Sequence, residues 1–413
     1  MKKTINQIIP EIKNIYPKEL LAFANKEYTI SVFDKLVIDF FNAISKLILR
    51  NSEINSNPAL VALGFWLRKG NIDSIAKENE FLLNSKKFKL QPRGIVFHIC
   101  PANVDTMFLY SLAISLLTGN KNILRLSSKL ENNDTTILFN IIRDLINSHE
   151  FIGLKEYLNI VKYEHDEEIS SYLSENADAR IIWGGDNTVN IFKKIKTKNR
   201  SKDIFFPNRV SYSVFKAQAF LSIDVEEKKN IVKKFYNDSY VFDQKGCSSP
   251  QLIFIKGIPE DCSCFKDELY RLLVEYSSSN YKNDISSLAS FKYSNLINDV
   301  VVENMHIQNV IKKNNYLYFV EIENESLQLN SCGAGYFYLK NIKDFSEITS
   351  FITTTVQTLT YFGLDSNEIE SICKNTYGKG IDRIVPIGQA LSFEYIWDGY
   401  NLLEELCLRR RII

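Results

Sequence analysis

Glycine and proline are scarce in this chain, at 16 and 9 of its 413 residues. This scarcity excludes collagen-like sequences and long disordered segments rich in these two residues. Histidine is scarcer still, with 4 residues, and the 7 cysteines form no paired CxxC modules, so we expect no metal site. The longest apolar stretch, Met107–Leu117, contains two serines and is too short to cross a bilayer, so we expect no contact with a membrane.

The chain also lacks an excess of charge of one sign. Lys+Arg 50 nearly balance Asp+Glu 49, which leaves a net charge of +1. Because positive and negative charges are so evenly balanced, the chain has no overall electric field that would favour nucleic acid as a partner. The cysteines are sparse and odd in number, and residues 1–7 carry two lysines without the apolar run of a signal peptide. We therefore expect a cytoplasmic protein with reduced thiols.

Several widespread enzyme motifs are absent as well. No GxGxxG stands between a strand and a helix, and the sequence contains no GxxxxGK[ST], no GxSxG and no HExxH. These absences exclude the ordinary dinucleotide fingerprint, the P-loop, the serine nucleophile elbow and the most common zinc protease motif. A cofactor that is held in another way is still compatible with the sequence.

The sequence pattern begins with a helical part and continues with alternating strands and helices. Residues 1–85 are expected to be a helical segment, because apolar residues recur at helical spacing over 32–48. An Asn-Pro pair, which suits a helix cap and first turn, predicts a second helix over 57–70. Four buried-strand runs, each followed by a helical pattern, then predict a parallel sheet with helices on both faces. These runs are 94–99, 122–126, 160–163 and 179–183.

A second series of strands and helices begins at Val210 and predicts a second α/β domain. Within it we expect helices at 225–240, 263–276 and 293–312. The predicted divisions are a helical segment (1–85), a doubly wound α/β domain completed by C-terminal residues (86–210), a second α/β domain (211–380) and a C-terminal segment (381–413).

One cysteine stands in a context that suits chemistry. Cys247 follows Lys245 and Gly246 and precedes two serines at the start of a predicted strand. The glycine allows a ligand to approach the backbone closely, and the lysine favours the thiolate. A structural cysteine buried in a turn would give the same pattern, so Cys247 is either a reactive thiol or a small buried residue.

The first predicted strand ends in Cys100-Pro101-Ala102-Asn103. Doubly wound sheets bind their ligands at the carboxyl ends of the strands. The Asn103 amide is able to donate a hydrogen bond to a developing oxyanion, but an asparagine here also suits the cap of the next helix. His98 is expected to be a core histidine rather than a base.

Two further strand ends suit a cofactor. Arg125, Ser127 and Ser128 close the second strand with a cation and two hydroxyls, which are groups that bind ribose or phosphate, although a solvated loop has the same composition. Gly184 and Gly185 stand between the fourth strand and its helix, where backbone N–H groups can face a pyrophosphate. A simple turn is the alternative.

Taken in order, these segments resemble the aldehyde dehydrogenase superfamily, and within it the acyl-CoA reductase branch typified by the LuxC family of bacterial luminescence. The resemblance covers residues 90–403, and the segment 380–388 together with 397–399 is similar to the reductase branch specifically. The matching elements are a Pro-x-Asn strand end at 101–103, a Gly-Asn pair at 119–120, a cation and serine at 125–127, a glycine turn at 184–185 and the Gly-Cys loop at 246–247.

The resemblance implies an aldehyde-dehydrogenase-like fold in which residues 86–210 bind a nicotinamide cofactor and residues 211–380 carry the nucleophile. Arg125 replaces the usual lysine, and an arginine is able to pair with a 2′-phosphate, so NADPH is expected, with NADH as the alternative. Asp105 stands where the branch often has proline. A homo-oligomer is expected from the superfamily. The implied cofactor-binding residues are Pro101, Arg125, Ser127, Ser128, Gly184 and Gly185.

The resemblance also implies a reaction, the reduction of an acyl thioester to an aldehyde. In it the Cys247 thiolate attacks the thioester, while the Asn103 amide and the Cys247 backbone N–H hold the oxyanion. The glutamate that activates water in aldehyde-oxidising members has no counterpart in 205–210, which favours exchange with a thiol over hydrolysis. The implied acyl donor is acyl-CoA or an acylated protein, with an acyl-protein synthetase as a partner.

Two other functions fit the same residues. An acyltransferase would use Cys247 without a redox step, and it would consume no nicotinamide. A non-catalytic binding protein would keep the fold without the chemistry.

Overall fold

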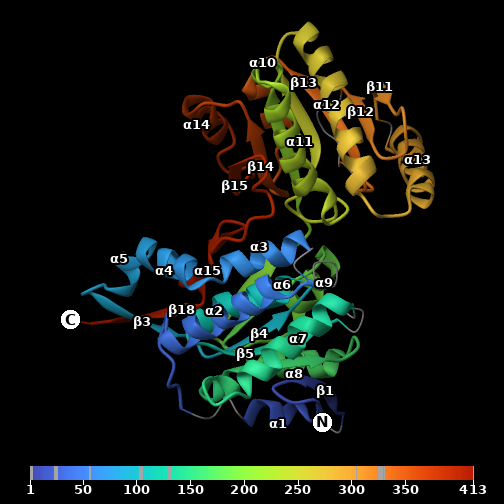
Figure 1. Cartoon of the computed structure of the whole chain (residues 1–413). Coiled ribbons are helices and arrows are strands. Elements are labelled where there is room, and N and C mark those ends of the chain that lie inside the picture. The colour runs from blue at the N-terminus through green and yellow to red at the C-terminus, as the bar shows by residue number, and fades with distance from the viewer. Residues whose placement is uncertain are drawn as a thin grey trace. The chain divides into compact units, whose positions relative to one another are not determined.

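The computed structural model describes residues 3–22, 27–54, 57–101, 106–127, 132–303, 305–323, 329 and 331–412. The chain divides into two compact units, which Figure 1 shows in blue to green with the end of the chain, and in green to red. Unit 1 comprises Met1–Asn208 and Phe393–Ile413, and unit 2 comprises Arg209–Ser392.

Unit 1 is built on a seven-stranded sheet. Across the sheet the strands are β2 (Lys13–Ile15), β1 (Ile5–Ile9), β6 (Leu158–Lys162), β5 (Lys121–Leu126), β4 (Ile95–Ile99), β7 (Ala179–Trp183) and β8 (Lys202–Phe206). The five strands from β6 to β8 are parallel. The chain winds outward from β4 to β6 and then returns to the other side of β4, so the direction of winding reverses beside β4.

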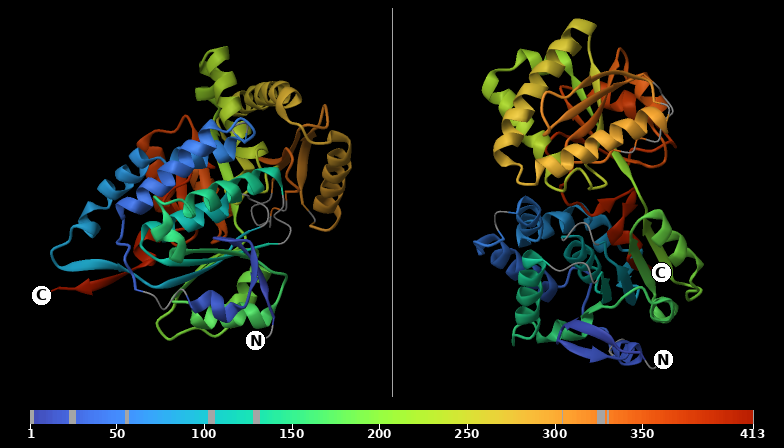
Figure 2. Two further views of the ribbon diagram at one scale, coloured as in Figure 1. Left: turned by 60° about the horizontal axis from the view of Figure 1, so that its bottom comes forward. Right: turned by 90° about the vertical axis from the view of Figure 1, so that its right-hand side faces the viewer.

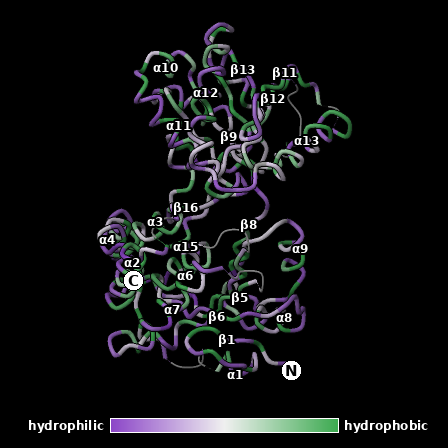
Figure 3. Tube along the Cα trace, turned by 45° about the vertical axis from the view of Figure 1, so that its right-hand side comes forward, coloured by the Kyte–Doolittle hydropathy of each residue, from purple (hydrophilic) through white to green (hydrophobic). Residues whose placement is uncertain are grey.

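Helices cover both faces of this sheet, as Figures 1 and 2 show. On one face lie α1 (Pro17–Ala22), α8 (Glu167–Asn176) and α9 (Asp186–Lys194). On the other face lie α2 (Lys35–Arg50), α3 (Pro58–Trp66), α4 (Lys69–Glu78), α6 (Met107–Leu117) and α7 (Asn133–Ile146). All 11 residues of α6 are buried, and Figure 3 shows this helix among the hydrophobic segments of the unit. Burial on every side explains why α6 is apolar all round.

The first residues of the chain are strands, so the prediction of a wholly helical segment over 1–85 was wrong at its start. β1 pairs antiparallel with β6, the outermost of the five parallel strands, and with β2. Ile5 and Ile9 are buried on opposite faces of the sheet. The edge of β6 offers unpaired backbone groups that β1 satisfies, and so short a run carries no periodicity that would reveal it.

The end of the chain returns to unit 1. β18 (Cys407–Arg411) pairs antiparallel with β3 (Phe88–Pro92). Before it, α15 (Leu402–Glu405) contributes Leu402 and Leu403 to the core of this unit. The Leu406 carbonyl accepts a hydrogen bond of 2.9 Å from Asn120 Nδ2. Residues from both ends of the chain therefore share one hydrophobic core.

Unit 2 is built on a second seven-stranded sheet. In order across it, the strands are β11 (Ile307–Ile311), β12 (Tyr318–Ile322), β13 (Tyr336–Ile342), β10 (Pro250–Lys256), β9 (Val210–Lys216), β14 (Val356–Phe362) and β15 (Arg383–Pro386). All pairs are parallel except β11 with β12. The helix predicted over 293–312 was wrong in its second half, because Ile307–Ile311 pairs with β12 as an edge strand.

The two faces of the second sheet carry separate apolar cores. α10 (Ala217–Ser222), α11 (Val225–Tyr240) and α12 (Pro259–Asn280) cover one face, and α14 (Ser366–Asn375) with the 3₁₀-helix Phe345–Phe351 covers the other. Two parallel α/β sheets confirm the predicted fold class. Within the described residues, no helix has both the length and the apolar character needed to cross a membrane.

Candidate active site

Three neighbouring strands of unit 1 end side by side at residues predicted to bind a cofactor. Parallel pairing aligns Ile99 of β4 with Arg125 of β5 and with Ile182 of β7. Pro101 follows β4, and Gly184 comes directly after β7. The direction of winding reverses beside β4, and ligands bind at the carboxyl edge of a sheet where such a reversal occurs. The sheet therefore brings segments that are distant in sequence to one edge.

Two glycines form the turn from β7 to α9. Gly185 is the cap residue of α9 and provides no side chain to cap the first turn. A Cβ on Gly184 would lie 2.9 Å from the Thr188 Cβ, and a Cβ on Gly185 would lie 3.2 Å from Asn208 Oδ1. The acidic residue of the first turn, Asp186, accepts the Asn208 N–H at 3.2 Å. Side chains at these two positions would crowd Thr188 and Asn208, and their absence suits close approach of a phosphate to the start of a helix.

Arg125 is held in place at the end of β5. Its side chain is buried, its Nη2 donates to the Tyr163 carbonyl at 3.1 Å, and the guanidinium lies 5.4 Å from the centroid of the Tyr163 ring. A guanidinium has five N–H donors, of which this bond uses one. Ser127 follows β5 and is half-buried. Two other predicted site residues, Asn103 and Ser128, lie outside the described residues.

His98 is a core histidine, as predicted. Its side chain is fully buried in β4, where Nδ1 lies 2.8 Å from Ser111 Oγ and Nε2 lies 3.1 Å from Asn122 Oδ1. Burial lowers the pKa of this imidazole to about 3. The side chain is therefore neutral at physiological pH and has both nitrogens engaged, so it serves packing and not proton transfer.

Cys247 lies in the loop between α11 and β10 of unit 2, and it is exposed. Cys100 and Cys407 are buried, and burial raises the pKa of both thiols, for Cys407 to about 12. Burial also raises the pKa of the half-buried Cys332 to about 12. These three thiols stay protonated at neutral pH and are poor nucleophiles. Cys264, on α12, is exposed like Cys247.

A buried glutamine fixes the loop that carries Cys247. Gln244 is 1% exposed and adopts a left-handed backbone conformation, with φ of 62°. Its Nε2 donates to the carbonyls of Pro250 at 2.8 Å and Tyr336 at 3.1 Å, and its Oε1 accepts the Gly335 N–H at 3.0 Å. One side chain thus joins the loop to the starts of two neighbouring strands, β10 and β13. Sequence reasoning did not identify this residue.

The segment before β13 braces the same loop. The backbone carbonyl of Asp243 accepts the Ala334 N–H at 2.8 Å. The side chain of Asp243 also takes part, because its Oδ1 accepts hydrogen bonds from the Tyr281 hydroxyl at 2.8 Å and from Asn283 Nδ2 at 2.6 Å. A Cβ on Gly333 would lie 2.2 Å from the Asp243 carbonyl oxygen, so only glycine fits there. The loop is therefore fixed on the side that precedes Cys247.

Helix α13 (Ile285–Val301) faces inward with polar residues. Among its side chains that the structure describes, Lys292 and Asp299 are the buried ones. Asp299 Oδ2 accepts bonds from the hydroxyls of Tyr336 at 2.6 Å and Tyr338 at 3.0 Å. These hydrogen bonds attach the helix to β13, and the half-buried Leu296 packs against the core beside them. Its exposed apolar side chains are Phe291, Tyr293, Ile297, Val300 and Val301.

Lys292 links α13 to the segment that braces the Cys247 loop. Its Nζ donates to the carbonyls of Asn315 at 2.6 Å and Ala334 at 2.8 Å. Burial lowers the pKa of the Lys292 ammonium to about 8, although the neighbouring Cys332 raises it. Ala334 in turn holds Asp243, so the lysine acts on the loop through one intervening residue.

The lowered pKa of Lys292 predicts a dependence of stability on pH. Between about pH 8 and 10.5 the unfolded chain binds a proton that the folded chain releases, so stability should rise with pH in this window. Relative to Lys292→Met, the wild type should therefore gain free energy of unfolding as the pH rises from 8 to 10. Urea denaturation of both proteins measures the difference, in which the contributions of other groups cancel. If the free energies of unfolding of the two proteins changed in parallel with pH, Lys292 would keep its proton in the folded chain.

The late segment that resembles the reductase branch is held from both sides. Asp238 of α11 accepts the N–H groups of Gly388 at 2.6 Å and Ala390 at 3.0 Å. The Arg383 guanidinium donates to the carbonyls of Ala390 at 3.0 Å and Gln389 at 2.8 Å. Burial raises the pKa of Asp238 to about 7, against the effect of these N–H groups. The motif thus forms a compact loop within unit 2.

The described residues contain no group of acidic, histidine or cysteine side chains that could hold a metal ion.

The fold is that of the aldehyde dehydrogenases, as predicted. A lactaldehyde dehydrogenase aligns over 100% of this chain and 96% of its own, with a TM-score of 0.65 and 14% identity. Aldehyde dehydrogenase C of Pseudomonas syringae, solved with NAD+ and octanal, aligns over 100% and 93%, with a TM-score of 0.62 and 11% identity. The NADP-dependent glyceraldehyde-3-phosphate dehydrogenase of Bacillus halodurans, solved with NADP, aligns over 99% and 95%, with a TM-score of 0.61 and 13% identity.

The chain belongs to the family described as acyl-CoA reductase (LuxC), whose sequence profile matches residues 70–409. The long-chain acyl-protein thioester reductase of Aliivibrio fischeri is 25% identical over 194 residues. That alignment covers 46% of this chain and 37% of the relative. The family predicted from the sequence motifs is therefore confirmed.

Proposed function

We propose that this protein reduces an acyl thioester to the aldehyde through an acyl group held on Cys247. The observation that carries the proposal is the exposed Cys247 in a loop fixed by Gln244 and Asp243, in a chain of the acyl-CoA reductase family. An accessible thiol on a rigid turn is what nucleophilic catalysis requires, because the sulfur has to meet the carbonyl in one geometry.

The proposed chemistry has two stages. First, the Cys247 thiolate attacks the thioester carbonyl, the bond to the donor sulfur breaks, and the donor leaves as a thiolate, which takes a proton from solvent. The oxyanion that forms is held by the Cys247 backbone N–H and the Asn103 amide. Second, a hydride adds to the carbonyl of the thioacyl group, and the resulting thiohemiacetal anion collapses to the aldehyde and returns the Cys247 thiolate. Residues 205–210, the region in which the resemblance places the water-activating glutamate of aldehyde-oxidising members, contain no carboxylate.

A nicotinamide cofactor fits the carboxyl edge of the first sheet, and it supplies the hydride when bound. The turn of Gly184 and Gly185 carries no side chains and leads into α9, which suits a pyrophosphate. Pro101, Arg125 and Ser127 stand at the neighbouring strand ends, with Ser128 following. The guanidinium of Arg125 is able to pair with the 2′-phosphate of NADPH, which favours NADPH as the cofactor, with NADH as the alternative.

The proposed donor is acyl-CoA or an acyl group carried on a protein thiol. The Aliivibrio fischeri relative is a long-chain acyl-protein thioester reductase, which supports a protein-bound donor. Such a donor requires a synthetase that loads the acyl group, and this synthetase would be a partner. A homo-oligomer remains an expectation from the superfamily.

Intact-mass measurement tests the function. The protein is incubated with acyl-CoAs from short to long chain, and with the matching N-acetylcysteamine thioesters as mimics of a protein-bound donor. We expect an acyl adduct that disappears on addition of NADPH, with release of one aldehyde per adduct, and NADH serves as the parallel reductant.

Two results would contradict the proposal. An adduct that neither reductant discharges would favour the acyltransferase. No adduct from either class of donor would favour the non-catalytic binding protein.

A further inference from the structure

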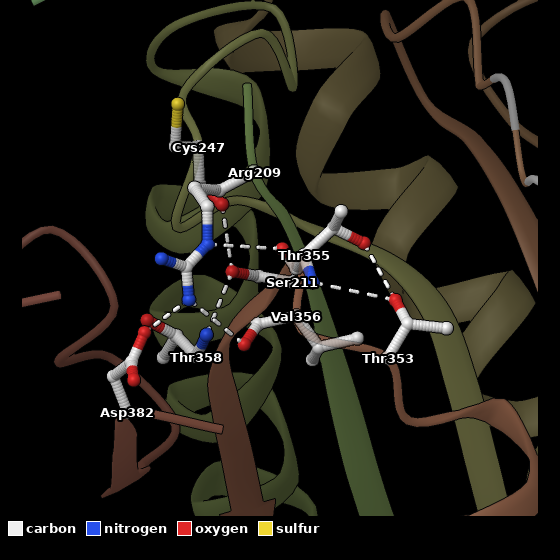
Figure 4. Close-up of polar contacts among 8 residues, drawn as sticks. All are labelled: Arg209, Ser211, Cys247, Thr353, Thr355, Val356, Thr358 and Asp382. Atoms are coloured by element: carbon white, nitrogen blue, oxygen red, sulfur yellow. Dashed lines mark hydrogen bonds and ion pairs between the residues drawn. The ribbon is translucent and has the colours of Figure 1, made fainter. Parts of the chain in front are cut away.

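The carbonyl group of Cys247 has a dedicated hydrogen-bond donor. Ser211 is the second residue of β9, and its side chain is fully buried. Its Oγ donates to the Cys247 carbonyl at 2.7 Å and accepts the backbone N–H of Thr358 at 3.1 Å. In Figure 4 the Cys247 carbonyl points toward Ser211, whereas the sulfur points away from it. The hydroxyl therefore bridges the backbone of the Cys247 turn and strand β14.

The serine lies where the ladder between β9 and β10 begins. β10 starts at Pro250, which pairs with Ser211, and the register between the two strands is irregular just beyond this pair. Cys247 lies three residues before this start, outside the ladder. The Ser211 side chain of β9 therefore supplies a hydrogen bond to a carbonyl that the ladder does not reach.

The turn is consequently anchored on both sides of the sulfur. Gln244 and Asp243 hold the residues before Cys247, and Ser211 holds its carbonyl. Between these anchors, the Ser249 N–H donates to the Gly246 carbonyl at 2.9 Å and closes the turn. Anchors on both sides restrict the backbone rotations that would shift the Cα and the N–H of Cys247, and with them the point from which the sulfur projects.

We propose that Ser211 is a positioning residue for Cys247, which keeps the sulfur and the backbone N–H of the turn in the geometry for attack on the thioester. This role rests on the proposed function, because it requires Cys247 to be the nucleophile. Ser211 itself touches neither the thioester nor the cofactor in this role, since its side chain is buried and its one O–H is donated to the Cys247 carbonyl.

Ser213 provides a matched control. It lies two residues further along β9 on the same face, is also fully buried, and has its Oγ 2.5 Å from Thr360 Oγ1. Replacing either serine by alanine removes one buried hydroxyl with its hydrogen bonds. Only the Ser211 hydroxyl reaches the Cys247 turn.

The first measurement is hydrogen exchange of the peptide 241–250 in the full-length protein without substrate. We expect faster exchange in Ser211→Ala and not in Ser213→Ala, with a similar fall in the urea midpoint of both variants. Ser211→Thr and Ser211→Val form a second matched pair, because they have the same shape and only the threonine keeps the hydroxyl. This pair decides the question if the alanine variant does not fold. We expect slow exchange in Ser211→Thr and fast exchange in Ser211→Val.

The second measurement is steady-state reduction of the acyl donor. We expect Ser211→Ala and Ser211→Val to lower kcat about 10- to 100-fold, the size typical of a small misplacement of a reacting group, with KM nearly unchanged. Ser211→Thr should restore most of kcat, and Ser213→Ala should retain it.

Equal exchange in the Ser211 and Ser213 alanine variants would overturn the proposal whatever the protein's activity. Faster hydrogen exchange in Ser211→Ala together with an unchanged kcat would overturn the proposal as well, because the hydroxyl would then hold the turn for stability alone. Full turnover in Cys247→Ala would instead overturn the proposed function, so the two failures are distinguishable.

Discussion

Cys247→Ala is expected to abolish both the acyl adduct and aldehyde formation. The reaction proceeds through a bond to the sulfur, and alanine offers no atom that replaces it. Because Cys247 is exposed, the substitution should leave the free energy of unfolding within about 0.5 kcal/mol of the wild type. Intact mass and turnover, measured on a protein of unchanged urea midpoint, check this expectation.

Cys264→Ala is the control for this experiment. Cys264 is exposed in the same unit, so the variant removes an accessible thiol without touching the Cys247 loop. It should acylate and turn over as the wild type does. An adduct that persists in Cys247→Ala and is lost in Cys264→Ala would assign the chemistry to the other cysteine.

Asn103→Ala is expected to lower kcat by about 10²–10³-fold, which is the usual effect of removing one oxyanion donor. The loss should appear in kcat, because the amide donates to an oxygen that becomes charged only as the thiolate attacks. Acyl-CoA binding should change little. Single-turnover acylation, followed by mass, measures the affected step directly.

Asn103→Asp separates this role from that of a helix cap. Aspartate caps a helix as well as asparagine does, but its carboxylate offers no N–H to an oxyanion. The variant should therefore keep the stability of the wild type and lose turnover as the alanine variant does. Normal turnover in Asn103→Asp would leave the residue as a cap only.

The arrangement of the strands in unit 1 followed from the sequence. Buried runs that alternate with helical patterns predict parallel strands, and the carboxyl ends of such strands meet at one edge. Ile99, Arg125 and Ile182 are aligned by the ladder as that rule requires. The resemblance in the motifs also predicted the family, which the match over residues 70–409 confirms.

The supports of Cys247 could not be predicted in the same way. Gln244 and Ser211 act through contacts with β13 and β14, strands that are 90 residues or more away in sequence. Ser211 and Ser213 did leave a signal, since two serines alternate with apolar residues in a strand buried at both faces. In such a strand a polar side chain needs a partner. The pattern shows that the partner exists, but not which residue it is.

The strand β1 was missed, and the end of helix α13 was misplaced, for related reasons. β1 is stabilised by pairing with β6, so its conformation depends on residues more than 150 positions away. Helix α13 fully buries Lys292 and Asp299 and exposes several apolar side chains, Phe291 and Val301 among them, which departs from the usual pattern of a surface helix. Periodicity alone therefore gave the wrong end for this helix.

The return of residues 393–412 to unit 1 has a consequence for synthesis. Leu402, Leu403 and Leu406 complete a core whose other members precede residue 209, so this core stays open until the last part of the chain has left the ribosome. Unit 2 has all of its sequence available earlier. The interrupted unit, although its synthesis starts first, is thus the last to close, and until then part of its apolar surface is open to aggregation.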